Sequence, residues 1–257
     1  MIELHQGDCA DVMKIMKNNS VDLTVTSPPY DNLRKYNGYE FDFENTAQEL
    51  YRVTKKGGVV VWVIGDATIK GSETGSSFKQ ALYFMKCGFN LHDTMIYEKN
   101  SSTYPANNKS NRYSQIFEYM FIFSKGKPKT HNLIKDKPNK WAGYKDFSGK
   151  LKNPVPEFSP RNNIWKYTTS FNGKTGHPAV FPEQLAYDHI LSWSNKGNTV
   201  LDCFLGSGTT GKTAKQLSRN FIGIEISKEY LDIAKERIKN DRWRIIYFSS
   251  EFIRGLY

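Results

Sequence analysis

The sequence predicts an α/β fold built on a doubly wound sheet with helices on both faces. Strand-like and helix-like segments alternate along most of the 257 residues, which is the pattern of such sheets. The run "VVVWVIGD" at 59–66 is apolar on both faces, as in a strand buried within a parallel sheet. In sheets of this kind, ligands bind beyond the carboxyl ends of the strands. Four strand-like segments end in polar residues that could bind a ligand there: Asp8, Ser27, Asp202 and Glu225.

The first half of the chain alternates in a regular way. Residues 9–19 predict a helix, because Val12, Ile15 and Met16 recur at helical spacing, and residues 21–30 predict a strand stopped by two prolines. A helix ended by Gly57 is expected next. The predicted segments of this half are strands at 1–8, 21–30, 59–66, 91–99 and 118–125, and helices at 9–19, 43–58 and 76–88.

The second half repeats the alternation after residue 180. Helices are expected at 181–194, 209–217 and 227–238, and strands at 198–204 and 220–226. Ser227 is the expected N-cap of the last helix, because a serine hydroxyl can accept a hydrogen bond from the first helical turn. The tail 241–257 has no clear pattern.

The charge of the chain indicates a polyanionic partner. The formal net charge is +10, and residues 125–152 contain nine lysines against Asp136 and Asp146. Aromatic residues interrupt this segment, which has no sustained helical or strand period. Charge runs are often only solvated, but ammonium groups among aromatic rings suit contacts with phosphates and bases. The candidate DNA-binding residues here are Lys137, Lys140, Trp141, Tyr144 and Lys145.

Cysteine use and hydropathy predict a cytoplasmic protein. The three cysteines are widely spaced, which predicts neither a disulfide framework nor a C-x-x-C metal site, and we expect no bound metal. No apolar run approaches the ~20 residues of a membrane helix, and no secretory signal begins the sequence.

A glycine-rich segment, "GSGTTGKT" at 206–213, fits the phosphate-loop pattern of nucleotide hydrolases. Asp66, the candidate for magnesium, lies upstream of the loop rather than downstream. Glu225 instead follows at the tip of the next strand, where an acid binds ribose hydroxyls in Rossmann-type sites. Asp202, just before the loop, would repel a triphosphate and attract a cation. An ATP site remains an alternative.

The segment "TSPPY" at 26–30 is the most specific signal in the chain. Together with "VLDCFLGSGTTG" and "GHPAVFPEQL", it resembles the amino-group DNA methyltransferases of the permuted beta class over residues 1–239. The resemblance implies a Rossmann-like S-adenosylmethionine-dependent methyltransferase fold. Its sheet would be mixed, mostly parallel and seven-stranded, with the chain starting at the third strand by family order.

The resemblance assigns roles to particular residues. Asp8 would contact the adenine of S-adenosylmethionine, Glu225 its ribose hydroxyls, and Pro178, Phe181 and Pro182 would lie near its methionine end. Cys203 departs from the proline that many relatives carry after the aspartate. The remaining cofactor-binding candidates are Asp202, Phe204, Gly206, Ser207, Gly208, Thr209 and Thr210. The catalytic candidates are Ser27, Pro28, Pro29 and Tyr30.

The family order also divides the chain and names its partners. Residues 1–124 would be the catalytic part, 125–163 a target-recognition insert, 164–240 the cofactor-binding part and 241–257 a tail. Double-stranded DNA is the expected partner, and Arg34 and Lys35 would meet its phosphates. A homodimer and a companion restriction endonuclease stay open.

The chemistry of the "SPPY" motif is consistent with methylation of an exocyclic amine. Such an amine is a poor nucleophile, and acceptors on Ser27 and Pro28 can favour a nitrogen with a free lone pair. Tyr30 would stack on a flipped base. By the resemblance, serine at the first position of the motif implies N4 of cytosine as the target, with N6 of adenine as the alternative. Two further alternatives are an ATP-binding protein and a DNA-binding module without catalysis.

Overall fold

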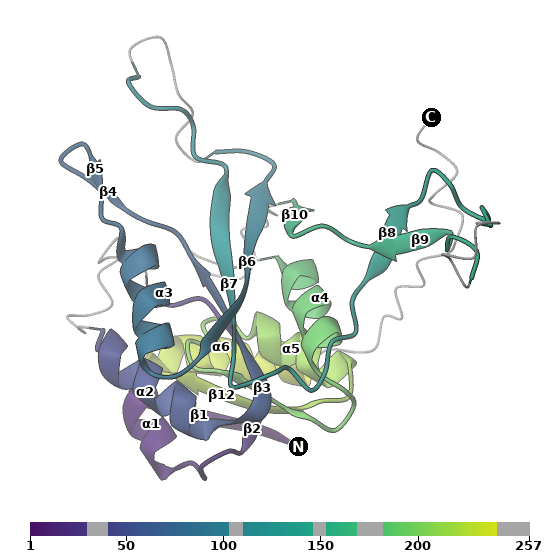
Figure 1. Cartoon of the computed structure of the whole chain (residues 1–257). Coiled ribbons are helices and arrows are strands. Elements are labelled where there is room, and N and C mark those ends of the chain that lie inside the picture. Colours follow the sequence, from purple (N-terminus) through teal and green to yellow (C-terminus); the bar gives the residue numbers. More distant parts are fainter. Residues whose placement is uncertain (30–40, 103–109, 146–152, 169–181, 241–257) are drawn as a thin grey trace.

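The computed structural model describes residues 1–29, 41–102, 110–145, 153–168 and 182–240. Its centre is an eight-stranded sheet (Figure 1). The spatial order is β1 (Ile2–Gln6), β12 (Asn220–Glu225), β11 (Thr199–Asp202), β2 (Val21–Thr26), β3 (Thr54–Ile64), β7 (Phe117–Ser124), β6 (Asn90–Lys99) and β10 (Ile164–Tyr167).

Within this sheet, β7 is antiparallel to both of its neighbours, and the other pairings are parallel. The mixed, mostly parallel sheet that the sequence predicts is therefore confirmed. It has one strand more than the expected seven, because the short β10 pairs with β6 at the edge.

Helices cover both faces of the sheet (Figure 1). Residues of α1 (Cys9–Ile15), α2 (Phe43–Val53) and α3 (Ser76–Lys86) pack in one apolar cluster. Residues of α4 (Glu183–Trp193), α5 (Thr209–Gln216) and α6 (Lys228–Lys239) pack in the other. Alternate residues of β3 enter the two clusters, since Val61 belongs to the α4–α6 side and Trp62 to the α1–α3 side. The apolar run at 59–66 is thus buried on both faces, as predicted.

Two small antiparallel sheets lie outside the central one. One pairs β4 (Thr68–Ile69) with β5 (Ser72–Glu73), and the other pairs β8 (Lys135–Pro138) with β9 (Phe158–Pro160). The second corrects the expectation of an irregular basic insert. The described residues at 135–145 and 153–160 are here called the basic arm; they are paired through β8 and β9 and project beside α4 (Figure 1).

Two details of the predicted helices are wrong. Helix α2 ends at Val53 rather than at Gly57, because Thr54 already pairs with Val21 as the first residue of β3. In α1, Cys9 and Met13 are buried and the predicted Val12 and Met16 pack against the same cluster, whereas the predicted Ile15 is 82% exposed. The predicted N-cap of α6 is confirmed, since the Ser227 side chain accepts a hydrogen bond from Tyr230 N.

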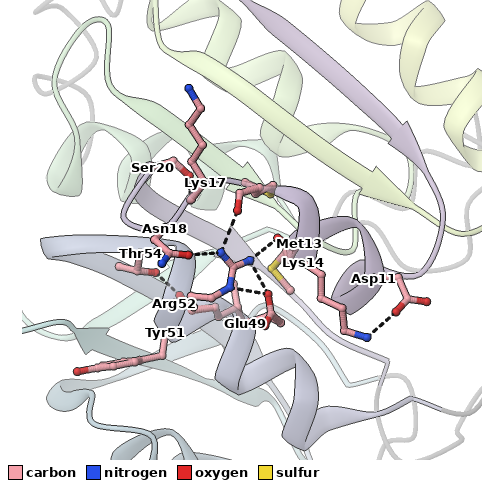
Figure 2. A network of polar contacts seen from close by, with 12 residues as sticks. Asp11, Met13, Lys14, Lys17, Asn18, Ser20, Glu49, Tyr51, Arg52 and Thr54 are labelled. Carbon is pink, nitrogen blue, oxygen red and sulfur yellow. Dashed lines mark hydrogen bonds and ion pairs between the residues drawn. The ribbon is translucent and has the colours of Figure 1, made fainter.

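An arginine of α2 fixes the end of α1. Arg52 donates hydrogen bonds to the carbonyl oxygens of Met13 and Met16 and to Asn18 Oδ1, while Glu49 accepts from its Nε at 2.9 Å (Figure 2). Carbonyls at the C-terminal end of a helix have no partner within the helix, so the guanidinium satisfies them. This contact holds the short helix that begins after Asp8.

Candidate active site

Four neighbouring strands bring the predicted site residues to one edge of the sheet. Strands β1, β12, β11 and β2 are consecutive and parallel, so their carboxyl ends lie side by side. Asp8 follows β1, Glu225 ends β12, Asp202 ends β11 and Ser27 follows β2. The Thr26 hydroxyl donates a 2.7 Å hydrogen bond to Asp202 Oδ1, which joins the "TSPPY" strand directly to the strand before the glycine loop.

Asp202 is a buried carboxylate whose pKa lies above the ordinary value. Burial raises its pKa from the ordinary 3.8 to about 6, although hydrogen bonds from Thr26, Thr210 and Phe204 N favour the ionised form. At neutral pH the group is therefore ionised inside a buried site. Such a site attracts a cationic ligand and repels a polyphosphate.

Glu225 is tied to the glycine loop. Its Oε2 accepts from Gly206 N at 2.8 Å, and its Oε1 accepts from Ser227 N at 2.9 Å. Burial raises the pKa of this carboxyl above its ordinary value. The backbone N–H of Ile226 also donates to this carboxylate. A carboxylate has about four lone-pair sites, so about one remains to accept a hydrogen bond from a ligand hydroxyl.

The loop backbone is packed tightly against α6. Gly208 has a φ of +82°, and a Cβ there would lie 2.9 Å from Ala234 Cβ. Thr209 Oγ1 is buried and has no hydrogen-bond partner among the described residues. An unpaired buried hydroxyl at the start of α5 fits a polar ligand, as S-adenosylmethionine is.

An arginine missed by sequence reasoning holds this loop. Arg237 of α6 donates through Nη1 to Ser207 O at 2.6 Å and to Ser207 Oγ at 2.5 Å. Burial lowers the pKa of its guanidinium. In the sequence Arg237 is one of several charged residues in an amphipathic helix, and nothing local distinguishes it.

The two residues that an ATP site would need are engaged elsewhere. Lys212 Nζ lies 2.8 Å from Glu183 Oε1 at the start of α4. Asp66, after β3, accepts hydrogen bonds from Ser77 N at 2.8 Å and Ser76 Oγ at 3.0 Å, at the first turn of α3. Burial would raise the Asp66 pKa, but these bonds hold it below its ordinary value. The contacts disfavour a phosphate loop.

The remaining predicted cofactor residues lie around this edge. Asp8 is the N-cap of α1 and accepts from Asp11 N at 3.0 Å, and Pro182 is the N-cap of α4. The Phe204 ring packs edge-on against Phe41, with centroids 5.1 Å apart. Gly206, Ser207 and Thr210 are buried with the rest of the loop.

The strand tip that carries the predicted catalytic residues is partly accessible. Ser27 and Pro29 are half-buried and Pro28 is buried. Five predicted site residues lie outside the described part of the chain: Tyr30, Arg34, Lys35, Pro178 and Phe181.

The predicted DNA-binding residues of the basic arm are exposed. They are Lys137, Lys140, Trp141, Tyr144 and Lys145. Trp141 is 73% exposed and Tyr144 52%, with ring centroids 6.5 Å apart. Lys125, counted among the nine lysines, has a different role, since its Nζ donates to Tyr51 O at 2.7 Å and Thr54 O at 3.0 Å.

Among the described residues, no group of three or more His, Cys, Asp or Glu side chains is arranged to hold a metal ion. Within the same ranges, every helix falls short of the length and apolar character needed to cross a membrane.

Comparisons with known proteins agree with this geometry. A family model described as DNA methylase (N6_N4_Mtase) matches residues 21–236. The chain is 60% identical over 253 residues to the orphan methyltransferase M.BamHII of Bacillus amyloliquefaciens, with 91% of each chain covered.

Solved structures give the same fold. The structure of M1.HpyAVI in complex with SAM is 28% identical, with a TM-score of 0.65 over 93% of this chain and 99% of that one. The PvuII DNA methyltransferase, described as cytosine-N4-specific, is 22% identical, with a TM-score of 0.71 over 94% of this chain and 88% of that one. The predicted fold class is confirmed by these similarities.

Proposed function

The chain belongs to the DNA methylase family of N4/N6 amino-methyltransferases, which use S-adenosylmethionine, and from this premise we propose that it methylates N4 of cytosine in double-stranded DNA. The target base would be flipped out of the duplex, as the chemistry of a buried exocyclic amine requires. We place the reaction in the cytoplasm with its DNA substrate.

The contact between Thr26 and Asp202 carries the proposal. The two residues are 176 positions apart in sequence, yet the hydrogen bond between their side chains is 2.7 Å long. It holds the tip that presents Ser27 beside the loop that would bind the cofactor. An amine held at Ser27 would therefore be close to a ligand held at Asp202, and alignment of this kind can contribute roughly 7–11 kcal/mol to a reaction.

Each residue then has a chemical task. Bound S-adenosylmethionine supplies an electrophilic methyl group on a positively charged sulfur. Ser27 Oγ and the Pro28 carbonyl accept hydrogen bonds from the two N–H groups of the target amine, which favours a nitrogen with its lone pair free. Pro28 and Pro29 restrict the backbone, so these acceptors are held in place before the base arrives.

The cofactor would be held by the opposite wall of the site. Asp202 provides negative charge for a cationic ligand, and Glu225 has a lone pair for a ribose hydroxyl. The glycine loop lets the ligand approach the backbone closely, and Arg237 fixes Ser207 within that loop.

The choice of cytosine depends on Ser27. Members of the resembled class with serine at this position usually methylate N4 of cytosine, and those with aspartate or asparagine more often N6 of adenine. The cytosine-specific PvuII enzyme is 22% identical and supports the fold alone. Because the relative with 60% identity is named an orphan methyltransferase, the proposal includes no companion restriction endonuclease.

A nucleoside analysis tests the proposal. The purified protein is incubated with S-adenosylmethionine and plasmid DNA from a methylation-deficient bacterial host, and the DNA is digested and analysed by mass spectrometry. We expect N4-methylcytosine. N6-methyladenine would reassign the base, and the absence of any methylated nucleoside would overturn the proposal. Sequencing of the modified plasmid then gives the recognition sequence.

A further inference from the structure

The basic arm has no core of its own. None of its described residues, at 135–145 and 153–160, is buried. The hairpin is closed instead by backbone hydrogen bonds, among them Asn139 N to Glu157 O and Val155 N to Tyr144 O, both 2.9 Å. A segment without buried apolar contacts depends on the contacts at its base for its orientation.

Arg161 provides such a contact immediately after the arm. Its Nε donates to Asp136 Oδ2 of β8 at 2.8 Å, and its Nη1 donates to Asp188 Oδ2 of α4 at 2.7 Å. The guanidinium carbon also lies 5.2 Å from the ring centroid of Trp165 in β10. One side chain therefore joins the arm, a helix and the edge of the central sheet.

The acceptor in α4 is itself firmly held. Asp188 is 4% exposed and also accepts from the Tyr167 hydroxyl and from Gln184 Nε2, each at 2.7 Å. At its N-terminal end, α4 reaches the cofactor side, where Glu183 pairs with Lys212 of α5. Arg161 thus connects the arm to the helix that borders the glycine loop.

We infer that Arg161 is a positioning residue for target DNA, which sets the orientation of the basic arm relative to the reaction site by bridging Asp136 and Asp188. The inference rests on the proposed function, because it takes the arm to be the surface that contacts the duplex. Arg161 itself need not touch DNA or cofactor.

The planar guanidinium suits this task. Its separate N–H groups donate to two carboxylates at fixed angles, whereas a lysine ammonium acts as a compact point charge and matches both acceptors less well. Asp188 is buried and Asp136 is about half exposed, so the bridge passes from the core to the surface. Loss of the bridge should leave the sheet intact but let the arm reorient.

Four variants of the full chain test the inference. Arg161→Ala removes the bridge, Arg161→Lys keeps the charge, and Asp136→Asn weakens only the arm side and leaves the buried pair in place. Asp232→Asn is the matched control, because it breaks an ion pair with Lys235 on α6 in which both side chains are about half exposed. For each variant, kcat and the KM values for plasmid DNA and for S-adenosylmethionine are measured, together with filter binding of the plasmid and the thermal midpoint.

We expect Arg161→Ala to raise the KM for DNA about tenfold. The KM for S-adenosylmethionine and kcat at saturating DNA should stay within about twofold of wild type. In Arg161→Lys the KM for DNA should rise less than in Arg161→Ala. Asp136→Asn should also raise the KM for DNA by a smaller factor, and Asp232→Asn should behave as wild type.

Two results would overturn the inference. One is an unchanged KM and filter-binding constant for DNA in both Arg161→Ala and Asp136→Asn. The other is a fall of kcat and of the thermal midpoint together with a rise of both KM values, since that pattern indicates a purely structural role. If the wild-type enzyme binds plasmid but methylates nothing, the proposed function fails, while filter binding of the same variants still decides whether Arg161 positions the arm.

Discussion

The hydroxyl of Thr26 and the carboxylate of Asp202 are joined by a 2.7 Å hydrogen bond across neighbouring strands β2 and β11. The bond couples the two halves of the proposed site, because Thr26 precedes Ser27, which we propose to be catalytic, and Asp202 precedes the glycine loop. Cofactor binding and catalysis should still be separable, since different atoms of these segments perform them.

Ser27→Ala should separate the two functions. We expect the single-turnover rate of methyl transfer to fall by roughly 10²-fold or more, because one preorganised hydrogen-bond acceptor is removed. The dissociation constant of S-adenosylmethionine, measured by calorimetry, should not change. Ser72→Ala, on the exposed strand β5, is the control for loss of a hydroxyl. A wild-type rate in Ser27→Ala would remove this serine from the mechanism.

Asp202 should make cofactor binding depend on pH. Its pKa in the folded protein is about 6, and a cationic ligand binds the ionised form better. Affinity for S-adenosylmethionine should therefore fall as the pH drops through 6, by about tenfold at pH 5 if only the ionised form binds. Calorimetry between pH 5 and 7 measures this.

Protonation of Asp202 does not itself destabilise the fold. Acid unfolding caused by this group therefore does not explain the expected loss of affinity for S-adenosylmethionine. A carboxyl whose pKa is raised in the fold binds its proton more tightly when folded, so its own contribution to the free energy of unfolding declines as the pH rises from 3.8 toward 6. Asp202→Asn should bind weakly with a flatter profile, the residual slope coming from Glu225. A wild-type affinity that is constant from pH 5 to 7 contradicts the assignment.

The exposed lysines of the basic arm should contribute to the salt dependence of DNA binding. Each ammonium that neutralises a phosphate adds about 0.9 to the slope of log K against log salt. We expect the slope to decrease, and affinity to fall, when four arm lysines are changed to glutamine. These are Lys135, Lys137, Lys140 and Lys145.

A control variant that removes the same number of positive charges can be made on the outer helices. It changes four exposed lysines away from the arm to glutamine, and its slope should stay closer to that of wild type. These are Lys79, Lys86, Lys228 and Lys235. Lys125 is unsuitable for either set, because it donates to carbonyls at the end of α2. Equal slopes in the two fourfold variants would show that the arm does not contact the phosphate backbone.

Local patterns predicted much of the fold. The apolar run containing Trp62 and the serine cap at Ser227 depend on neighbours in sequence, and both were anticipated. The anchoring arginines were not, because the carbonyls that accept from Arg52, and the partners of Arg161 and Arg237, lie on other elements or in the loop that α6 covers. An arginine in a helix or loop has the same local signal whether it is solvated or bridges buried acceptors.

Glycine 208 offers a test of how tightly the cofactor loop is built. Gly208→Ala places a Cβ 2.9 Å from Ala234 Cβ, at a φ of +82°. The left-handed conformation costs an alanine about 1–2 kcal/mol, and overpacking typically adds about 1–3 kcal/mol. We expect the free energy of unfolding, measured with denaturant, to fall by about 2–5 kcal/mol. Affinity for S-adenosylmethionine should fall with it, because the loop must move away from α6.

Gly197→Ala isolates the backbone part of this effect. Gly197 has a φ of +79°, but a Cβ there would meet nothing within 4 Å, so the variant bears only the backbone penalty. The difference between the two variants measures the contact of the loop with α6. Equal decreases in the free energy of unfolding of Gly208→Ala and Gly197→Ala would mean that α6 moves aside at no measurable energetic cost. The conformation of the loop would then be fixed by Glu225 and Arg237 rather than by packing against α6.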